Sequence, residues 1–293
     1  MASGNVSTWL VTGASAGFGQ AISMAALTAG HRVIGGTRDV AKAEAANPGF
    51  TAKGGIWMQL DPSHPSAFDQ FSKGQGGYDI DVLVNNAGYA FVGGVEDGSE
   101  ADVREQMDIN FWGPLRAVQA VLPSMREKRR GNIVLISSGT VYSCRPARGA
   151  YSASKAAIEA MHEVLQKEIE SFGIKVLIVE PGTFKTTMAL NLKSSAAHES
   201  TNGFSEGYKG TVLDQWVGIM RNSSKVPLLP NRVMGDPDKA ANAILKAVVE
   251  GHDYLRMVLG ADCLKAMELK LGELHHDLEA TREIALSMTS ETA

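Results

Sequence analysis

Short runs of consecutive apolar residues alternate with amphipathic helical patterns along the first two thirds of the chain. Most runs are continuous rather than in-and-out, which is typical of parallel strands covered on both faces. The predicted strands are Thr8–Thr12, Arg32–Gly35, Gly55–Gln59, Val82–Asn85, Asn132–Ser137 and Lys175–Glu180. The helical patterns between them include Gly17–Ala29, Ala101–Val121 and Tyr151–Phe172. The alternation predicts an α/β fold with a doubly wound parallel sheet.

Composition narrows the class of protein. With 293 residues, of which 44% are hydrophobic, the chain can bury a sizeable core, and wholesale disorder is excluded. Its two cysteines, Cys144 and Cys263, cannot form a disulfide scaffold, which favours a reducing compartment. A net charge of −4 argues against nucleic acid as the main partner. No signal peptide or membrane span fits the sequence, so we expect a soluble, cytoplasmic protein.

The alternation lapses at 187–236. Polar residues and glycines mix there with apolar ones such as Met188, Leu192, Phe204 and Trp216. A long irregular segment with this composition predicts a lid insertion over a binding site. Two surface helices with a buried face are an equal and compatible interpretation. No domain boundary is visible, so we predict one domain over 1–293.

The tail at 260–289 predicts a C-terminal helix. Its apolar residues fall on one helical stripe, namely Leu264, Met267, Leu271, Leu274 and Leu278. We expect this stripe to pack on the body of the same chain. A subunit contact or a cap over the pocket are the alternatives.

A glycine-rich turn follows the first predicted strand and precedes the first predicted helix. Thr12–Gly19 has the spacing G-x-x-x-G-x-G. Glycines there allow a tight turn and bring backbone N–H groups close to a pyrophosphate, and the next helix adds its positive N-terminus. The position between strand and helix favours dinucleotide binding over an ordinary turn.

The end of the second predicted strand bears on which dinucleotide binds. An NAD site normally has an acidic residue there, to hold the ribose 2′-hydroxyl. Thr37 stands there instead, followed by Arg38. A guanidinium can neutralise a 2′-phosphate, so the pair favours NADP(H). Asp39 could pair with Arg38 and weaken this preference, and an ordinary surface arginine is the alternative.

A tyrosine and a lysine open the helical pattern that begins at Tyr151. Tyr151 and Lys155 are four residues apart and share one helix face. A nearby ammonium favours the tyrosinate and lowers the tyrosine pKa, which would suit proton exchange with a substrate oxygen. Ser137 and Ser138 end a predicted strand, where α/β sheets place their sites, and could hold a carbonyl oxygen or cap a loop.

These motifs together resemble the short-chain dehydrogenase/reductase family. The resemblance covers about residues 7–190 and matches the compact, NADP(H)-type, single-domain branch with its Rossmann-type fold. Its elements are Thr12–Gly19, Asn85-Asn86-Ala87-Gly88, Asn110, Ser138, Tyr151-x-x-x-Lys155 and Pro181-Gly182. The main departure is Phe18, which replaces the usual aliphatic residue between the last two glycines. Lys185 adds a charge to which we assign no role.

The resemblance implies a catalytic role for four residues. Tyr151 would be the proton donor in reduction and the base in oxidation, and Ser138 would hydrogen-bond the substrate carbonyl. Lys155 would bind the nicotinamide ribose and lower the tyrosine pKa, while Asn110 would hold a relay water. The implied cofactor-binding residues are Gly13, Ser15, Gly17, Phe18, Gly19, Thr37, Arg38, Asp61, Asn86, Gly88, Tyr151, Lys155, Pro181, Gly182, Phe184 and Thr186.

Substrate and partners are less constrained by the sequence. The expected pocket residues are mostly apolar, which predicts a lipophilic ketone, aldehyde or secondary alcohol; they are Phe91, Val92, Val141, Cys144, Met188, Leu192, Phe204 and Trp216. The resemblance implies a homodimer or homotetramer, commonly through the helix that bears Tyr151 and the helix before it. No metal-ligand spacing is present.

Two other classes of function share these features. The chain could be a dinucleotide-binding sensor, although a complete catalytic set argues against a protein without turnover. It could also catalyse a non-redox rearrangement or cyclisation with NADP(H) as a scaffold. Consumption of cofactor in step with product formation would distinguish an oxidoreductase from both.

Overall fold

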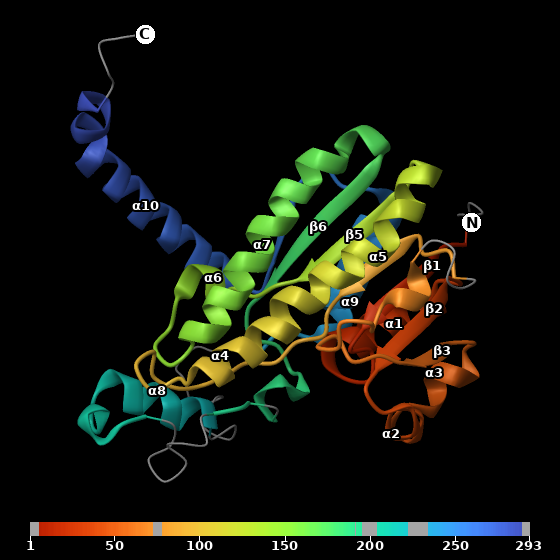
Figure 1. Ribbon diagram of the computed structural model, residues 1–293, viewed down its shortest axis with the longest axis horizontal. Coiled ribbons are helices and arrows are strands. Elements are labelled where there is room, and N and C mark those ends of the chain that lie inside the picture. The colour runs from red at the N-terminus through yellow and green to blue at the C-terminus, as the bar shows by residue number, and fades with distance from the viewer. Residues whose placement is uncertain (1–5, 73–77, 191, 195–203, 222–233, 289–293) are drawn as a thin grey trace.

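A single sheet of seven parallel strands forms the centre of the protein in the computed structural model, which describes residues 6–72, 78–190, 192–194, 204–221 and 234–288 (Figure 1). The order across the sheet is β3-β2-β1-β4-β5-β6-β7. The strands are β1 (Thr8–Thr12), β2 (Arg32–Thr37), β3 (Ile56–Gln59), β4 (Val82–Asn85), β5 (Gly131–Ile136), β6 (Ile174–Pro181) and β7 (Arg256–Leu259). The order reverses between β1 and β4, which confirms the doubly wound, Rossmann-type fold.

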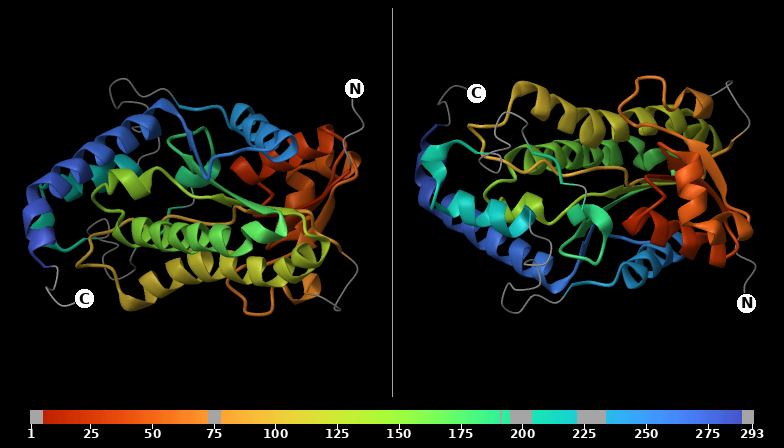
Figure 2. Two further views of the ribbon diagram at one scale, coloured as in Figure 1. Left: turned by 90° about the horizontal axis from the view of Figure 1, so that it is seen from above. Right: turned by 90° about the horizontal axis from the view of Figure 1, so that it is seen from below.

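Helices cover both faces of the sheet (Figure 2). On one face α1 (Gly17–Thr28) and α9 (Pro237–Glu250) pack over apolar residues that include Val11, Val84 and Val179. On the other face lie α4 (Glu100–Met107), α5 (Gly113–Lys128) and α7 (Gly149–Ile169), over a core that includes Leu83 and Leu135. Because both faces are buried, the strands read as continuous apolar runs.

The remaining described helices lie around the edges of the sheet. They are α2 (Val40–Ala46), α3 (Pro48–Ala52), α6 (Thr140–Ser143), α8 (Val212–Arg221) and α10 (Ala261–Ser287). In the described part of the chain, no helix has the length and apolar character needed to cross a membrane.

The predicted helix Ala101–Val121 is interrupted in the structure. A π-helical turn at Asp108–Trp112 separates α4 from α5. Pro114 has no N–H, so it cannot give the carbonyl of Asn110 the bond that an α-helix requires. Turns of this kind are frequent at functional sites, and this one contains a residue predicted to be catalytic.

A separate apolar cluster holds the described part of the segment 187–236. Phe204 and three residues of α8, Leu213, Val217 and Met220, pack against Val92 and Ala147. This helix therefore has the buried face of a surface helix. Residues 191, 195–203 and 222–233 of the predicted insertion lie outside the described part of the chain.

The C-terminal helix forms as predicted, but most of its apolar stripe does not pack on the body. Leu264, Leu271, Leu274 and Leu278 are each 51–56% exposed, whereas Met267 is partly buried. The start of α10 contacts α6 and β7, with Cys263 buried, and the rest of the helix projects from the molecule (Figure 1). The expectation of packing on the same chain is therefore wrong for four of the five residues, because periodicity identifies an apolar face and not the surface that covers it.

Candidate active site

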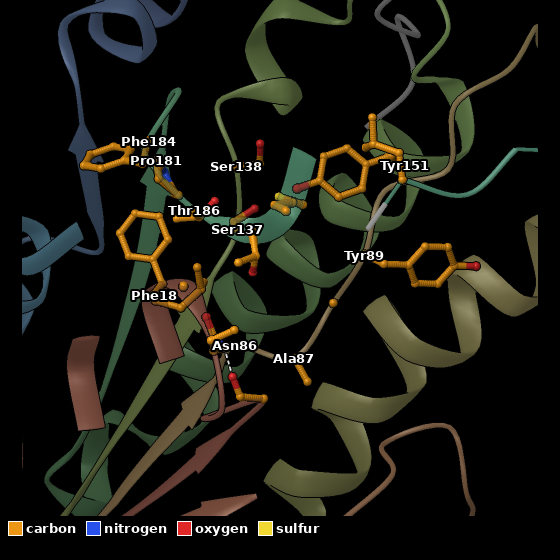
Figure 3. A pocket seen from close by; sticks show the side chains of 18 of the residues that line it. Phe18, Asn86, Ala87, Tyr89, Ser137, Ser138, Tyr151, Pro181, Phe184 and Thr186 are labelled. Atoms are coloured by element: carbon orange, nitrogen blue, oxygen red, sulfur yellow. Dashed lines mark hydrogen bonds between the residues drawn. The ribbon is translucent and has the colours of Figure 1, made fainter. Parts of the chain in front are cut away.

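A cleft of about 1290 Å³ lies at the carboxyl ends of the central strands (Figure 3). Reversal of strand order between β1 and β4 leaves a crevice at this edge. Nearly all the predicted site residues line it, namely Gly13, Ser15, Gly17, Phe18, Thr37, Arg38, Asp61, Asn86, Gly88, Ser138, Tyr151, Lys155, Pro181, Gly182, Phe184 and Thr186. Two predicted residues, Gly19 and Asn110, lie behind its wall.

Glycine backbone conformations and hydrogen bonds from Asn86 fix the shape of the glycine-rich turn. Gly13 and Gly17 have φ angles of +65° and +57°, which favour glycine. A side chain on Gly19 would overlap the carbonyl oxygen of Gly13. The Asn86 Nδ2 atom donates to the carbonyl oxygens of Thr12 (2.9 Å) and Gly13 (3.1 Å). The Asn86 amide thus stabilises the turn by two hydrogen bonds. The resemblance implied only a cofactor contact for this residue.

Backbone donors face the cleft where α1 begins. The residue before Gly17, Ala16, has an extended backbone and no side-chain cap. The first N–H groups of a helix lack partners within it, and they carry the positive end of the helix dipole. Together with the open glycine turn, these donors fit a pyrophosphate group.

Two cations lie beside the end of β2. Arg38 is exposed and lines the cleft with Lys42, a residue that the sequence analysis missed. The Asp39 carboxylate accepts from the Lys42 backbone N–H (2.9 Å) and so caps α2. Within the part of the chain that the structure describes, Asp39 forms no ion pair with Arg38, so the competing pairing is not seen.

Tyr151 is the buried tyrosine of the cleft, with 2% of its surface exposed. Burial raises its pKa, while the charge of Arg148 and a hydrogen bond from Ser138 lower it. The net direction is upward, so the expected lowering of the Tyr151 pKa is wrong for this structure. Burial of the side chain outweighs the charge of Arg148 and the hydrogen bond with Ser138.

Lys155 lies one helical turn from Tyr151 and is also buried. Its Nζ donates to the carbonyl oxygen of Ile136 (2.8 Å). Burial lowers the Lys155 pKa to about 8, although the charge of Glu159 raises it. Sequence spacing predicted the proximity of the two side chains, but not how strongly burial acts on both.

Asn110 is completely buried behind the lysine. Its Nδ2 donates to the carbonyl oxygen of Tyr89 (3.0 Å) and to Ser154 Oγ (3.1 Å). A Cβ on Gly88 would lie 3.0 Å from Asn110 Oδ1 and 3.7 Å from Lys155 Nζ. Gly88 therefore leaves room between the asparagine and the lysine.

The loop after β6 is fixed by the first turn of α10. The backbone N–H of Thr183 donates to Asp262 Oδ2 (2.9 Å), and a side chain on Gly182 would overlap Asp262. Phe184 packs against Phe18 with ring centres 4.9 Å apart (Figure 3). The sequence did not predict a role for Asp262, because no local pattern indicates that the first turn of this helix contacts a loop far back in the chain.

The apolar wall of the cleft differs in part from the one predicted from sequence. Met188, Leu192 and Trp216 line it as predicted, and Ile219, Met220 and Ala266 were missed. Five predicted residues do not line it, namely Phe91, Val92, Val141, Cys144 and Phe204. Val92 and Phe204 belong to the apolar cluster under α8, and Cys144 is exposed. Apolar character alone did not distinguish a pocket wall from a core.

Asp61 also lines the cleft, and its Oδ1 accepts from the Ser63 backbone N–H (3.0 Å) and Oγ (2.8 Å). Across the described ranges, no group of three His, Cys, Asp or Glu side chains is arranged to hold a metal ion.

Comparisons with known proteins agree with this arrangement. The sequence profile described as short chain dehydrogenase matches residues 7–197. "Oxidoreductase BOA17" of Botryotinia fuckeliana is 32% identical over 95% of this chain and 98% of its own. "Oxidoreductase claN" of Passalora fulva is 45% identical over 61% of this chain and 83% of its own.

Solved structures give the same result. A short-chain dehydrogenase from Streptomyces avermitilis superposes with a TM-score of 0.80 at 34% identity, over 99% of this chain and 100% of that chain. A short-chain dehydrogenase from Sphingobium yanoikuyae in complex with NADPH shares the fold, with a TM-score of 0.69 at 21% identity over 98% of each chain. The profile match and the well-covered relatives place this chain in the short chain dehydrogenase family, as an oxidoreductase.

Proposed function

We propose that the protein is an NADP(H)-dependent oxidoreductase that interconverts a lipophilic ketone or aldehyde and the corresponding alcohol. The observation that carries the proposal is the meeting of Tyr151, Ser138 and Lys155 in one cleft with the glycine-rich turn. When bound, the nicotinamide would supply or accept the hydride.

The polar residues of the cleft divide the remaining work. In reduction, Tyr151 would donate the proton to the substrate oxygen. Ser138, hydrogen-bonded to Tyr151, would orient the same oxygen. Lys155 would bind the ribose hydroxyls, and Asn110 would support a proton path to the lysine.

The end of β2 supports NADP(H) over NAD(H). Arg38 and Lys42 line the cleft there, and Thr37 holds the position where an NAD site has an acidic residue. Since Asp39 caps α2, both cations are available to a 2′-phosphate. The Sphingobium yanoikuyae structure, which has the same fold, is in complex with NADPH, and this supports the proposed cofactor.

The apolar wall supports a lipophilic substrate. Met188, Leu192, Trp216, Ile219 and Met220 line it, and apolar walls of this kind bind apolar ligands by removing surface from water.

The outer face of α4, α5 and α7 supports assembly into a homodimer or homotetramer. These helices and the π-helical turn between α4 and α5 carry the exposed apolar side chains Val103, Trp112, Met161 and Val164. Light scattering after size exclusion would give the oligomeric state, and a monomer would contradict this part of the proposal.

The test compares NADPH with NADH by absorbance, with a panel of bulky ketones and aldehydes. We expect faster loss of NADPH, in step with alcohol formation. Arg38→Ala should raise the KM for NADPH about 10-fold or more and leave that for NADH nearly unchanged. Arg32→Ala, at the opposite end of β2, is the matched control. NADPH binding without turnover of any ketone, or of any alcohol with NADP⁺, would refute the proposal.

A further inference from the structure

Two arginines line the cleft beside the apolar residues of α8. Arg145 and Arg148 lie in the turn between α6 and α7, and both line the cleft. The guanidinium carbon of Arg148 lies 5.4 Å from the centre of the Tyr151 ring, and its Nε donates to Met220 Sδ (3.1 Å). Arg145 lies over the Trp216 ring at 5.4 Å. Both guanidinium groups are thus held between this turn and α8 by aromatic and sulfur contacts.

Neither guanidinium has a protein counter-ion among the described residues. The carboxylates that line the cleft are engaged elsewhere: Asp39 caps α2, Asp61 binds Ser63, and Asp262 accepts from the backbone of Thr183. Burial lowers the pKa of Arg148, which reflects the cost of holding its charge away from water.

Two other partly buried cations, unlike Arg148, have carboxylate partners. Arg256, 28% exposed, binds three carboxylates, and Lys128, 17% exposed, binds two. Lys155, 5% exposed, has no carboxylate in contact but donates to the carbonyl oxygen of Ile136, so each of these cations has an oxygen partner, as the cost of an unpaired buried charge requires. At Arg148 the partner is therefore expected from outside the described chain, in the cleft that the side chain faces.

We propose that Arg148, assisted by Arg145, binds a carboxylate of the substrate, so that the preferred substrate is an apolar ketone or alcohol that carries an acid group. This inference rests on the proposed function and names the substrate class of the same site. A guanidinium stacked on an aromatic face keeps its in-plane N–H donors free, and these suit the two oxygens of a carboxylate. The surrounding apolar wall strengthens such a bond by excluding water.

The position of Arg148 also shows how the acid group would be oriented. Because this side chain lies over the ring of Tyr151, a carboxylate bound to it would sit beside the reacting centre and not at the mouth near Arg38. The acid would then fix which carbonyl of a larger molecule reaches the tyrosine. Arg148 is in this sense a specificity-determining residue.

The experiment measures binding, so that it does not depend on turnover. Para-acetylbenzoate and an acetylnaphthoate are titrated calorimetrically into the NADP⁺-saturated enzyme, beside the methyl ester of each. We expect the acids to bind about 10-fold or more tightly than their esters. Arg148→Met should remove most of this preference and leave the affinity for the esters within about twofold. Arg148→Lys should keep part of it.

Two further variants control for structure. Arg145→Met should reduce the acid preference by a smaller factor. It gives an independent test if Arg148→Met unfolds at a lower temperature than the unaltered enzyme. Arg104→Met, on the exposed face of α4, removes the same charge far from the cleft and should change nothing.

Three outcomes would overturn the inference. The first is equal binding of acid and ester by the unaltered enzyme, and the second is an equal loss for both in Arg148→Met. The third is an unchanged acid preference in Arg148→Met together with a shifted pH dependence of turnover, measured with a neutral ketone, which would mean that Arg148 acts on Tyr151 and not on substrate. None of the three contradicts NADPH-dependent reduction of neutral ketones, so failure here is distinct from failure of the proposed function.

Discussion

Replacement of Arg256 by methionine tests whether a buried charge cluster holds the catalytic helix to the sheet. Arg256, on β7, lies 2.9 Å from carboxylate oxygens of Glu159 and Glu163 on α7 and of Glu180 on β6. Glu159 is one helical turn from Lys155, and its other oxygen accepts from Ser137 at the cleft. The cluster therefore joins the helix that carries Tyr151 to the edge of the sheet.

The size of the effect follows from burial. The side chains of Glu180 and Glu159 are 0% and 7% exposed, so removal of Arg256 leaves two carboxylates without their cation. Breaking a buried pair in this way costs about 3–5 kcal/mol of unfolding free energy. The control is Arg282→Met, which breaks a pair with Glu279 whose side chains are 54% and 46% exposed. An exposed pair is worth about 1 kcal/mol or less.

The loss of unfolding free energy in Arg256→Met should increase as pH rises. Burial raises the pKa of Glu159 to about 7 and that of Glu180 as well, both above the usual 4.5. The folded protein therefore binds more protons than the unfolded chain, and stability falls as pH rises from 4.5 through 7. Without Arg256 both pKa values rise further, so the variant should lose more stability at pH 8 than at pH 5.5.

The assay is urea unfolding followed by circular dichroism at both pH values and one protein concentration. Adding Glu180→Gln to Arg256→Met should recover part of the loss, because a neutral amide needs no cation. A loss no larger than that of Arg282→Met, or one that is the same at both pH values, would refute the reasoning.

Two further predictions concern the cofactor and the reaction. Tyr151→Phe should lower turnover about 100-fold or more, since it removes the proton donor; NADPH affinity, measured by fluorescence titration, should stay within about twofold, and retained turnover would contradict the assigned role. Gly19→Ala should weaken NADPH binding about 5-fold or more, because the new methyl group overlaps the Gly13 carbonyl and displaces the turn. Gly272→Ala, which has open space around it on α10, is the matched control and should bind NADPH normally.

The sheet was predictable from sequence because its strands carry their own signal. Strands covered on both faces are continuous apolar runs, and six were recognised with nearly correct bounds. The seventh, β7, was missed because it is short, none of its residues is buried, and Arg256 interrupts its apolar run. The other edge strand, β3, has no buried residue either, but its uninterrupted run of Ile56, Trp57 and Met58 was recognised.

The end of the cleft at the glycine-rich turn was also predictable, for a physical reason. A turn at a strand end places consecutive residues at one edge of the sheet, so the positions of Gly13, Gly17 and Arg38 on the cleft could be predicted from their neighbours alone. The substrate end was predictable only in part, because its wall comes from the α6–α7 turn, from α8 and from the start of α10. Met188, Leu192 and Trp216 were expected there, but no local pattern shows that Ile219, Met220 or Asp262 reaches a cleft formed by strands far back in the chain.

The residues proposed to react and much of the apolar wall lie in different parts of the sequence. Tyr151, Lys155 and the glycine-rich turn lie inside the stretch matched by the family profile, which ends at residue 197. Trp216, Ile219, Met220 and Asp262 lie beyond it and still line the cleft. Arg145 and Arg148 lie inside the matched stretch, but they are held against Trp216 and Met220 of α8. If the two arginines bind substrate as proposed, we therefore expect changes in α8 to redirect them and alter the choice of substrate, while Tyr151, Ser138 and Lys155 keep their positions.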